Sequence, residues 1–480
     1  MPRARAAVSY DLDMLTEDEL RQDMAMVMRA GDLLADATAR AQAYLEAAPD
    51  RRVAPSTDAV AGLDRFREPL PESVGDAHSV LAMLDEVGSP GTMAQVGGRF
   101  FGLVNGGVVP AGLAARMLAD AWDQNAVLHA VSPTNAVIEE TCQAWLCELL
   151  GLPEQTVAGF VSGTSMAIVC GLAAARWRLC ERAGYDVNAG GLAGAPALRI
   201  VTGRHAHSTV LKAVALLGFG THNIEWADVD DQGRLDPVSL PDLDERTILI
   251  LQAGNVNSGA FDPIRECVER GHAAGAWTHV DGAFGLWAAA SASLAHLTDG
   301  HELADSWSVD GHKTLNTPYD NGISLCADPE AMVAALQNSA DYIMYSGQRD
   351  GMLYTPEMSR RARAVDLWAT LRYLGREGVD RLVSSLHERA LQFREELVGA
   401  GFDVINEVVF NQVMIRVGDQ AATDAFVGDV QASGEAWVGA SSWFGEPIVR
   451  VSVCSWMTAP DDVRRAVAAF SSARKAGPSR

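Results

Sequence analysis

The chain has 480 residues, of which 48% are hydrophobic and 21% are charged, a composition typical of a globular protein with a large core. It carries 38 lysines and arginines against 62 aspartates and glutamates, which gives a formal net charge of −24. A surface this acidic argues against nucleic acid and anionic membranes as partners, although backbone amides at a helix N-terminus can still hold a phosphate.

No segment has the pattern of a secretion signal or a membrane span. The opening residues, MPRARAAVSYDLDM, contain two arginines without an apolar run behind them, and the most apolar long window, residues 280–297, is interrupted by Asp281. Seven cysteines without a CxxC pair predict reduced thiols and no metal site of the structural zinc type. We therefore expect a cytoplasmic protein that binds neither nucleic acid nor a membrane.

The first third of the chain is expected to be mainly helical. The TEDE motif at residues 16–19 is a capping-box pattern before an amphipathic helix. Residues 48–75 are rich in Pro, Asp and Arg and are expected to form a linker. Ser132 and Pro133 are typical of a helix start, and we expect the helix that they begin to end at Gly151.

From residue 159 to 330, short apolar runs alternate with helices. The runs are five or six residues long and rich in β-branched residues, which is typical of strands buried on both faces of a mostly parallel sheet. The expected strands are residues 198–202, 247–252, 276–281, 306–310 and 322–327, and a helix is expected over residues 166–183.

The end of the chain has a different pattern. A long amphipathic helix is expected over residues 361–375 and another up to Gly399, followed by alternating strands and a final helix. We therefore predict an α/β protein with an N-terminal helical segment and linker (1–90), a large α/β domain (91–355) and a small C-terminal α+β domain (356–480).

Polar side chains follow most of the predicted strands, where functional groups of open parallel sheets gather. Before these strands, Ser162, Gly163, Thr164 and Ser165 form a glycine turn that leads into a helix, and its free N–H groups suit a phosphate. Most such turns are simply N-caps, so this motif alone is weak evidence. The strand-end groups are residues 204–207, Asn255 and Asn257, Asp281, and residues 310–313.

Lys313 is the candidate for covalent chemistry, although a single lysine after a strand is usually a surface charge. It lies 32 residues after Asp281, between an apolar strand and a segment rich in Gly and Pro. A lysine amine, a buried carboxylate and a phosphate cradle are what pyridoxal 5'-phosphate (PLP) needs. The amine forms a Schiff base, the carboxylate keeps the ring nitrogen protonated, and the cradle anchors the phosphate.

The order of these motifs resembles the group II PLP-dependent amino acid decarboxylases, which have the aspartate aminotransferase fold (fold type I). The resemblance covers roughly residues 75–475 and implies a seven-stranded, mostly parallel sheet flanked by helices, in a homodimer whose active site is shared at the subunit interface. The motifs that carry it are residues 162–165, 206–208, 259–262, 279–283 and 312–313, with Ser132-Pro133 and residues 359–361 in addition.

The resemblance implies a role for each matching residue. Lys313 is expected to form the Schiff base, and Asp281 to pair with the ring nitrogen. His207 is expected to stack on one face of the ring and to act with Lys313 as a catalytic residue, while Ala283 packs on the other face. The remaining cofactor contacts are assigned to Gly163, Thr164, Ser165, Asn255 and His312.

Some positions depart from the family pattern. Relatives often have Asn where this chain has Asp310, and because an acid beside a phosphate is unfavourable, we expect Asp310 to bind backbone or a neighbouring cation. Many relatives have Gly-Thr-Thr where this chain has Gly-Asn-Val at residues 254–256. Residues 102–105 are smaller and less aromatic than the matching substrate wall, and Asn105 is a candidate substrate contact. The identity of the amino acid substrate therefore stays open.

The implied reaction converts an L-amino acid to the amine and CO₂ through Schiff-base and quinonoid intermediates. A proton must then reach Cα, and in the family a tyrosine on a mobile loop of the other subunit delivers it. Residues 345–356 match that stretch and make Tyr354 the candidate donor and substrate contact. An ordinary half-buried loop tyrosine explains Tyr354 equally well, since Tyr342 and Tyr345 lie nearby.

Several alternatives remain. A PLP-dependent aldolase, lyase, aldehyde-forming enzyme or aminotransferase would share these motifs, because they serve the cofactor and not the reaction. A catalytically silent PLP-binding homologue is disfavoured because Lys313 and Asp281 are intact. A metal-dependent hydrolase would use His205 and His207, His279 and Asp281, and Asp310 and His312 as ligands.

Arg450 is a further candidate. It resembles the carboxylate-binding arginine of aminotransferases, but arginines at strand ends often form ion pairs, and we expect a structural ion pair here.

Overall fold

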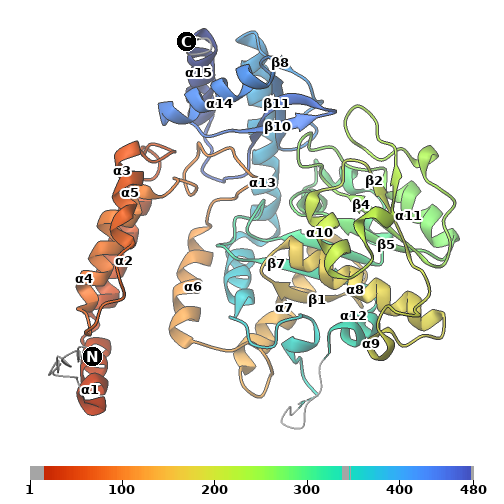
Figure 1. Ribbon diagram of the computed structural model, residues 1–480, viewed down its shortest axis with the longest axis horizontal. Coiled ribbons are helices and arrows are strands. Elements are labelled where there is room, and N and C mark those ends of the chain that lie inside the picture. The colour runs from red at the N-terminus through yellow and green to blue at the C-terminus, as the bar shows by residue number, and fades with distance from the viewer. Residues whose placement is uncertain (1–15, 338–344, 346, 477–480) are drawn as a thin grey trace, which may run out of the picture. The chain divides into compact units, whose positions relative to one another are not determined.

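The computed structural model describes residues 16–337, 345 and 347–476 (Figure 1). The chain is divided between Ala94 and Gln95 into two compact units, which we call the N-terminal unit and the main unit. Within the described ranges, no helix is both long and apolar enough to cross a membrane.

The N-terminal unit consists of short helices. The predicted capping box is present, since the Thr16 hydroxyl accepts a hydrogen bond from the Glu19 N–H and the Glu19 carboxylate accepts one from the Thr16 N–H. The segment predicted as a linker, 48–75, instead contains a helix, because the Ser56 hydroxyl caps it by accepting the Ala59 N–H at 3.2 Å. The helices are α1 (Glu17–Ala30), α2 (Asp32–Ala47), α3 (Thr57–Gly62), α4 (Ala77–Met83) and α5 (Ser89–Gly91), with a 3₁₀ turn at Leu63–Phe66 and a π turn at Leu84–Gly88.

The main unit is built on a seven-stranded sheet with the order β1-β7-β6-β5-β4-β2-β3. Four of its six strand pairings are parallel, and β7 runs antiparallel to both β1 and β6. The predicted α/β class with a mostly parallel sheet is therefore confirmed. The strands are β1 (Val157–Val161), β2 (Arg199–Gly203), β3 (Ile224–Ala227), β4 (Thr247–Gln252), β5 (Trp277–Asp281), β6 (Ser306–Asp310) and β7 (Gly322–Cys326).

Both faces of this sheet are covered by helices, as continuous apolar strands require (Figure 1). One face packs on α8 (Thr164–Arg182), α10 (Ser208–Leu216) and α12 (Pro329–Leu336). The other packs on α7 (Pro133–Leu150), α11 (Ile264–Ala273) and the first half of α13 (Arg363–Gly399). The main unit also contains α6 (Pro110–Trp122), α9 (Val187–Gly190) and 3₁₀ turns at Thr221–Asn223, Pro237–Ser239, Gly285–Ala290, Ala295–Thr298, His301–Leu303 and Gly351–Leu353.

Two predicted helix boundaries have clear local causes. Helix α7 starts at Pro133 and ends where Gly151 adopts the left-handed conformation at φ 67°. The two helices predicted on either side of residue 375 form one element, α13, which is kinked at Gly375 (φ 58°, ψ −176°). That backbone conformation favours glycine, so the predicted break becomes a bend.

The end of the chain forms a second, antiparallel sheet with the order β10-β11-β9-β8. Its own apolar core lies between this sheet and the second half of α13, α14 and α15. The elements are β8 (Asp403–Val404), β9 (Gln412–Arg416), α14 (Gln420–Ser433), β10 (Gly439–Trp443), β11 (Glu446–Ser452) and α15 (Pro460–Ala476).

Candidate active site

A pocket of about 460 Å³ lies where the carboxyl ends of the central strands meet the N-terminus of α8. Strands β5 and β6 end in Asp281 and Asp310, whose side chains line it together with Lys313. Of the residues predicted to hold the cofactor, the pocket brings together Gly163, Thr164, Ser165, His207, Asp281, Ala283, His312 and Lys313.

The N-terminus of α8 forms the predicted cradle. The Thr164 side chain is only 4% exposed, and its hydroxyl has no hydrogen-bond partner among the described residues. Gly163 and Gly322 of β7 lie so close that a Cβ at Gly322 would overlap the backbone of Gly163. The turn can therefore approach β7 this closely only because position 322 lacks a side chain.

Asp310 connects the cradle to Lys313. Its Oδ1 accepts the Thr164 N–H at 2.7 Å, and its Oδ2 lies 2.9 Å from the Lys313 Nζ. This is the arrangement expected from the sequence, in which the acid turns to backbone and to a cation. Burial disfavours the charged lysine, but the carboxylates of Asp310 and Asp281 outweigh this and raise the pKa of Lys313.

His312 is held beside the same carboxylate in a defined tautomer. Its Nδ1 accepts the Asn321 N–H at 3.0 Å, so a neutral ring carries its proton on Nε2, which lies 3.5 Å from the Asp310 Oδ2. The ring stacks on Tyr319 with 4.2 Å between centroids. Burial, the largest cause, lowers the pKa of His312 in spite of the acid.

Asp281 is a buried carboxylate with few donors of its own. Its Oδ1 accepts hydrogen bonds from the Ala283 N–H at 3.3 Å and from the Ser308 hydroxyl at 3.5 Å. Burial raises the pKa of Asp281 to about 6, although the charge of Lys313 opposes this. The charged Asp281 carboxylate is therefore only partly stabilised by the protein and can pair with a cationic group bound in the pocket.

His207 is neutral at pH 7 in this environment. Burial, aided by the charges of Lys313 and Arg450, lowers its pKa to about 4. Its Nδ1 accepts the Thr209 N–H at 3.3 Å and lies 2.7 Å from the Thr209 hydroxyl. These contacts fix the ring at the start of α10, where it lines the pocket.

Asn255 does not line the pocket, in contrast to the other residues predicted to bind the cofactor. Its side-chain oxygen accepts the N–H groups of Asn257 and Ser258, and its amide donates to the His205 carbonyl at 3.3 Å. These contacts hold the turn after β4, and the pocket is lined there by Gly254 and Val256 instead.

The two residues predicted to contact substrate also lie outside the pocket of their own chain. The Asn105 Oδ1 accepts a hydrogen bond from the Tyr319 hydroxyl at 3.0 Å, while Leu103 and Val104 line the pocket beside it. The Tyr354 ring lies under the Arg349 guanidinium at 4.4 Å and packs against the cluster around α8. Its predicted role in a partner's site stays a prediction.

Of the other loop tyrosines, Tyr342 lies outside the described residues, and Tyr345 is 46% exposed.

The ion pair expected for Arg450 is not formed with any residue that the structure describes. The guanidinium donates instead to the Val256 carbonyl at 3.0 Å, and Val256 lines the pocket. Burial lowers the pKa of Arg450 to about 10. The expectation failed because β11 places this arginine beside the turn after β4, where it donates to a backbone carbonyl instead of pairing with an acid.

Sequence reasoning missed three pocket residues, Thr209, Gln252 and Phe284. Gln252 ends the apolar run of β4 and could have been found by its position, since the other strand-end residues were singled out in that way. Thr209 and Phe284 follow functional motifs by one or two positions but carry no pattern of their own.

The alternative metal site is not formed, because His205 and His279 do not line the pocket that contains the other four proposed ligands. Within the described parts of the chain, no group of three or more His, Cys, Asp or Glu side chains could hold a metal ion. His205 packs against Trp443 and Phe444, and His279 lies inside the sheet.

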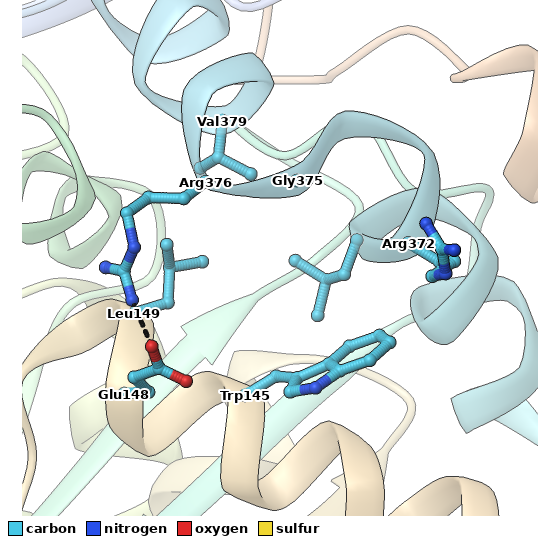
Figure 2. A pocket seen from close by; sticks show the side chains of 8 residues that line it. Trp145, Glu148, Leu149, Arg372, Gly375, Arg376 and Val379 are labelled. Atoms are coloured by element: carbon cyan, nitrogen blue, oxygen red, sulfur yellow. Dashed lines mark hydrogen bonds and ion pairs between the residues drawn. The ribbon is translucent and has the colours of Figure 1, made fainter.

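A second cavity of about 360 Å³ lies away from this site, between α7 and the kink of α13. Figure 2 shows Trp145 and Leu149 of α7 facing Val379 of α13, with the Glu148–Arg376 ion pair at its rim. It shares no residue with the first pocket.

The pocket residues fit PLP. The unpartnered Thr164 hydroxyl and the α8 N-terminus suit the phosphate, the Lys313 amine faces the same space, and Asp281 offers a buried carboxylate for the ring nitrogen.

The comparisons with known proteins agree with this fit. The Pyridoxal-dependent decarboxylase conserved domain matches residues 71–417. The chain therefore belongs to the PLP-dependent amino acid decarboxylases, which are carboxy-lyases.

Curated relatives differ in the substrates that they are named for. The L-2,4-diaminobutyrate decarboxylase of Rhizobium meliloti is 29% identical over 428 residues, which cover 84% of this chain and 81% of that protein. The aspartate 1-decarboxylase of Aliivibrio fischeri is 30% identical over 261 residues, covering 50% of this chain and 47% of that protein.

Solved structures show the same fold. Oryza sativa TDC with PLP and tryptamine has a TM-score of 0.83 and 22% identity over 97% of this chain and 99% of that chain. Mouse CSAD in apo form has a TM-score of 0.83 and 20% identity, covering 93% of this chain and 99% of that chain.

Proposed function

We propose that this decarboxylase holds PLP through Lys313, Asp281 and the α8 cradle. The observation that supports this assignment is that all three line one pocket. Lys313 supplies the amine that bonds to the cofactor, Asp281 pairs with the ring nitrogen, and Thr164, Ser165 and His312 receive the phosphate. When bound, PLP stores the electron pair released as the Cα–carboxylate bond breaks.

The protein's own groups orient the substrate. Arg450 is a partly buried cation that donates to the carbonyl of Val256, a pocket residue, and it has no carboxylate partner among the described residues, so we assign it the attraction of the substrate carboxylate. His207 stays neutral and packs on the cofactor ring, so it adds no positive charge that would hold the substrate carboxylate in place. Leu103, Val104 and Phe284 exclude water from the remaining wall.

Proton delivery to Cα is assigned to a second subunit. Tyr354 does not reach the pocket of its own chain, so its predicted role requires a homodimer with a shared active site. Helices α1 and α2 support a partner surface, because neither has a buried residue and Met24, Met26, Met28 and Leu34 are each more than half exposed.

The substrate is proposed from the relatives. We place small L-amino acids with a second charged group first, because L-2,4-diaminobutyrate decarboxylase and aspartate 1-decarboxylase name such substrates. The experiment is a panel with L-2,4-diaminobutyrate, L-aspartate, L-glutamate, L-tyrosine and L-tryptophan on the PLP-loaded protein, following CO₂ and product mass together. The expected result is CO₂ with the matching amine from one of the first two.

The same panel tests the rival chemistry. The 4-hydroxyphenylacetaldehyde synthase of Rhodiola rosea is 26% identical over 356 residues, which gives an aldehyde-forming reaction a specific basis. CO₂ with an aldehyde would identify that chemistry. A spectral change without CO₂ would contradict the assignment and indicate aldolase, lyase or aminotransferase activity.

We also propose a cytoplasmic location, which is supported by the cysteines. All seven are buried and free, as a reducing compartment favours.

A further inference from the structure

Asp281 is connected to a row of buried polar side chains on the face of the sheet that packs against α8. Strands β5 and β6 pair in parallel, with His279 opposite Ser306 and Asp281 opposite Ser308. Because alternate residues of a strand point to the same face, Trp277, His279 and Asp281 form one column, and Ser306 and Ser308 form the next. All of them except Asp281, which is 5% exposed, are at most 1% exposed.

The column forms a continuous chain of hydrogen bonds. The Trp277 Nε1–H donates to the Ser306 hydroxyl at 3.0 Å, and the Ser306 hydroxyl lies 2.8 Å from the His279 Nδ1. The His279 Nε2 lies 3.4 Å from the Ser308 hydroxyl, which in turn donates to the Asp281 Oδ1 at 3.5 Å. This hydrogen-bond chain therefore begins at the Trp277 indole and ends at the Asp281 carboxylate.

The direction of donation along this hydrogen-bond chain is set by the indole, which cannot accept. An indole N–H can only donate, so Ser306 accepts there, and the only acceptor found for its own proton among the described residues is the His279 Nδ1. A neutral His279 must then carry its proton on Nε2 and donate to Ser308. The Ser308 proton is left for Asp281, so every member donates towards the carboxylate.

Helix α8 leaves room for these hydrogen-bonded side chains at Gly171. A Cβ at Gly171 would lie 2.8 Å from the His279 Cε1 and Nδ1 and 3.3 Å from the Ser306 Oγ. Any larger residue would displace the imidazole. The close approach also excludes water from His279, and burial lowers its pKa to about 3, so it stays neutral and cannot neutralise Asp281 by charge.

We propose that His279 and Ser308 are positioning residues that hold Asp281 charged and facing the ring nitrogen of the cofactor. This inference rests on the proposed pairing of Asp281 with that nitrogen. Other charges near Asp281 are Lys313 and Asp310, which act on it from the pocket side. The hydrogen-bond chain acts on Asp281 through the Ser308 hydroxyl, which does not line the pocket. This donor favours the Asp281 carboxylate over the protonated acid.

The test uses holoenzyme loaded with PLP labelled with ¹⁵N in the ring. Ser308→Ala removes the donor to Asp281, and His279→Met breaks the chain one step earlier. The carboxylate then becomes more basic and draws the shared proton from the ring, so the ¹⁵N shift moves towards its unprotonated position at neutral pH. We expect kcat to fall roughly tenfold with KM unchanged, since substrate contacts are intact.

Two controls separate this role from loss of packing. In His279→Gln the amide can accept from Ser306 and donate to Ser308, so the wild-type ¹⁵N shift is expected. Ser324→Ala removes another fully buried strand hydroxyl, which lies opposite Ser308 on β7 and donates to the Ala167 carbonyl at 3.1 Å. It should leave the ring signal unchanged.

The outcomes distinguish the two proposals. An unchanged ring signal in Asp281→Asn would overturn the pairing on which the proposed function relies. A shifted signal in Asp281→Asn combined with wild-type signals in both Ser308→Ala and His279→Met would overturn the positioning role alone. Equal shifts in Ser308→Ala and Ser324→Ala would also overturn it, because the effect would then be one of packing.

Discussion

Asp281 is kept charged in the pocket against its own burial, so its position costs stability. The difference between its ordinary pKa of 3.8 and its raised pKa of about 6 corresponds to about 3 kcal/mol. The unfolded chain binds a proton at this group only below about pH 4, whereas the folded protein already binds one below about pH 6. The penalty is therefore complete above pH 6 and shrinks as the pH falls.

We accordingly predict that Asp281→Asn stabilises the cofactor-free protein by up to about 3 kcal/mol at pH 8, and by less at pH 5. Urea denaturation of both proteins at the two pH values measures this. A stability difference that does not depend on pH would contradict the ionisation penalty.

Lys313 gives the most direct test of the cofactor assignment. Lys313→Ala should abolish the absorbance of bound PLP at about 420 nm, because that band requires the covalent bond to the lysine amine. Lys212→Ala changes a lysine outside the pocket and should keep the band. Persistence of the band in Lys313→Ala would remove Lys313 from the site.

The sequence predicted which residues line the pocket better at the motif positions than between them. Lys313, Asp281 and the cradle belong to motifs in which chemistry restricts the residue type, so they could be recognised along the chain. Asn255 matched a motif position too, but its contacts to backbone depend on how the turn after β4 folds. Arg450 was misjudged for a similar reason, since only the tertiary structure shows that it donates to the Val256 carbonyl.

At the scale of elements, the sequence predicted five of the seven strands of the large sheet, and it missed β1 although every residue in that strand is buried. Strands β4 and β6 match their predicted ranges, because every residue in them is buried. Strand β3 was missed since its four residues, IEWA, form too short an apolar run and two of them are only partly buried. The reversal of β7 could not be predicted either, because apolar periodicity does not encode strand direction.

The segment that carries Tyr354 is fastened to α7 by a buried ion-pair cluster. The fully buried Glu139 carboxylate lies 3.0 Å from the Arg349 Nε and 2.7 Å from the Arg360 Nη1. Burial opposes its charge, but the two arginines outweigh this and lower the pKa of Glu139. The cluster holds both ends of residues 349–360 on the same helix.

We predict that Glu139→Gln destabilises the protein by about 3–5 kcal/mol, because it leaves two buried guanidinium groups without a counter-charge. The matched control is Glu148→Gln on the same helix, whose ion pair with Arg376 is exposed (Figure 2) and should contribute at most about 1 kcal/mol. Chemical denaturation of both variants measures the contrast. Similar losses in both would contradict the role of the cluster.

At the scale of the whole molecule, the proposed shared site makes a prediction about mixed subunits. Lys313→Ala and Tyr354→Phe homodimers should each be deficient. A heterodimer of the two has one site in which an intact Lys313 meets an intact Tyr354 of the other chain. Co-expression should therefore restore activity in about a quarter of all sites, given random pairing. Absence of recovery, with heterodimers verified by differently tagged chains, would show that Tyr354 is not shared.

The position of β1 has a consequence for how the protein is made. Strand β1 lies at the edge of the large sheet, and among the described strands it pairs with β7 alone, with Val161 opposite Gly322. A ribosome must therefore add roughly 160 residues after β1 before its partner exists, which takes roughly ten to thirty seconds at about 5–20 residues per second. Throughout that interval the apolar segment VAGFV stays unpaired. We expect the nascent chain to depend on chaperones until β7 has emerged, and the sheet to close late in synthesis.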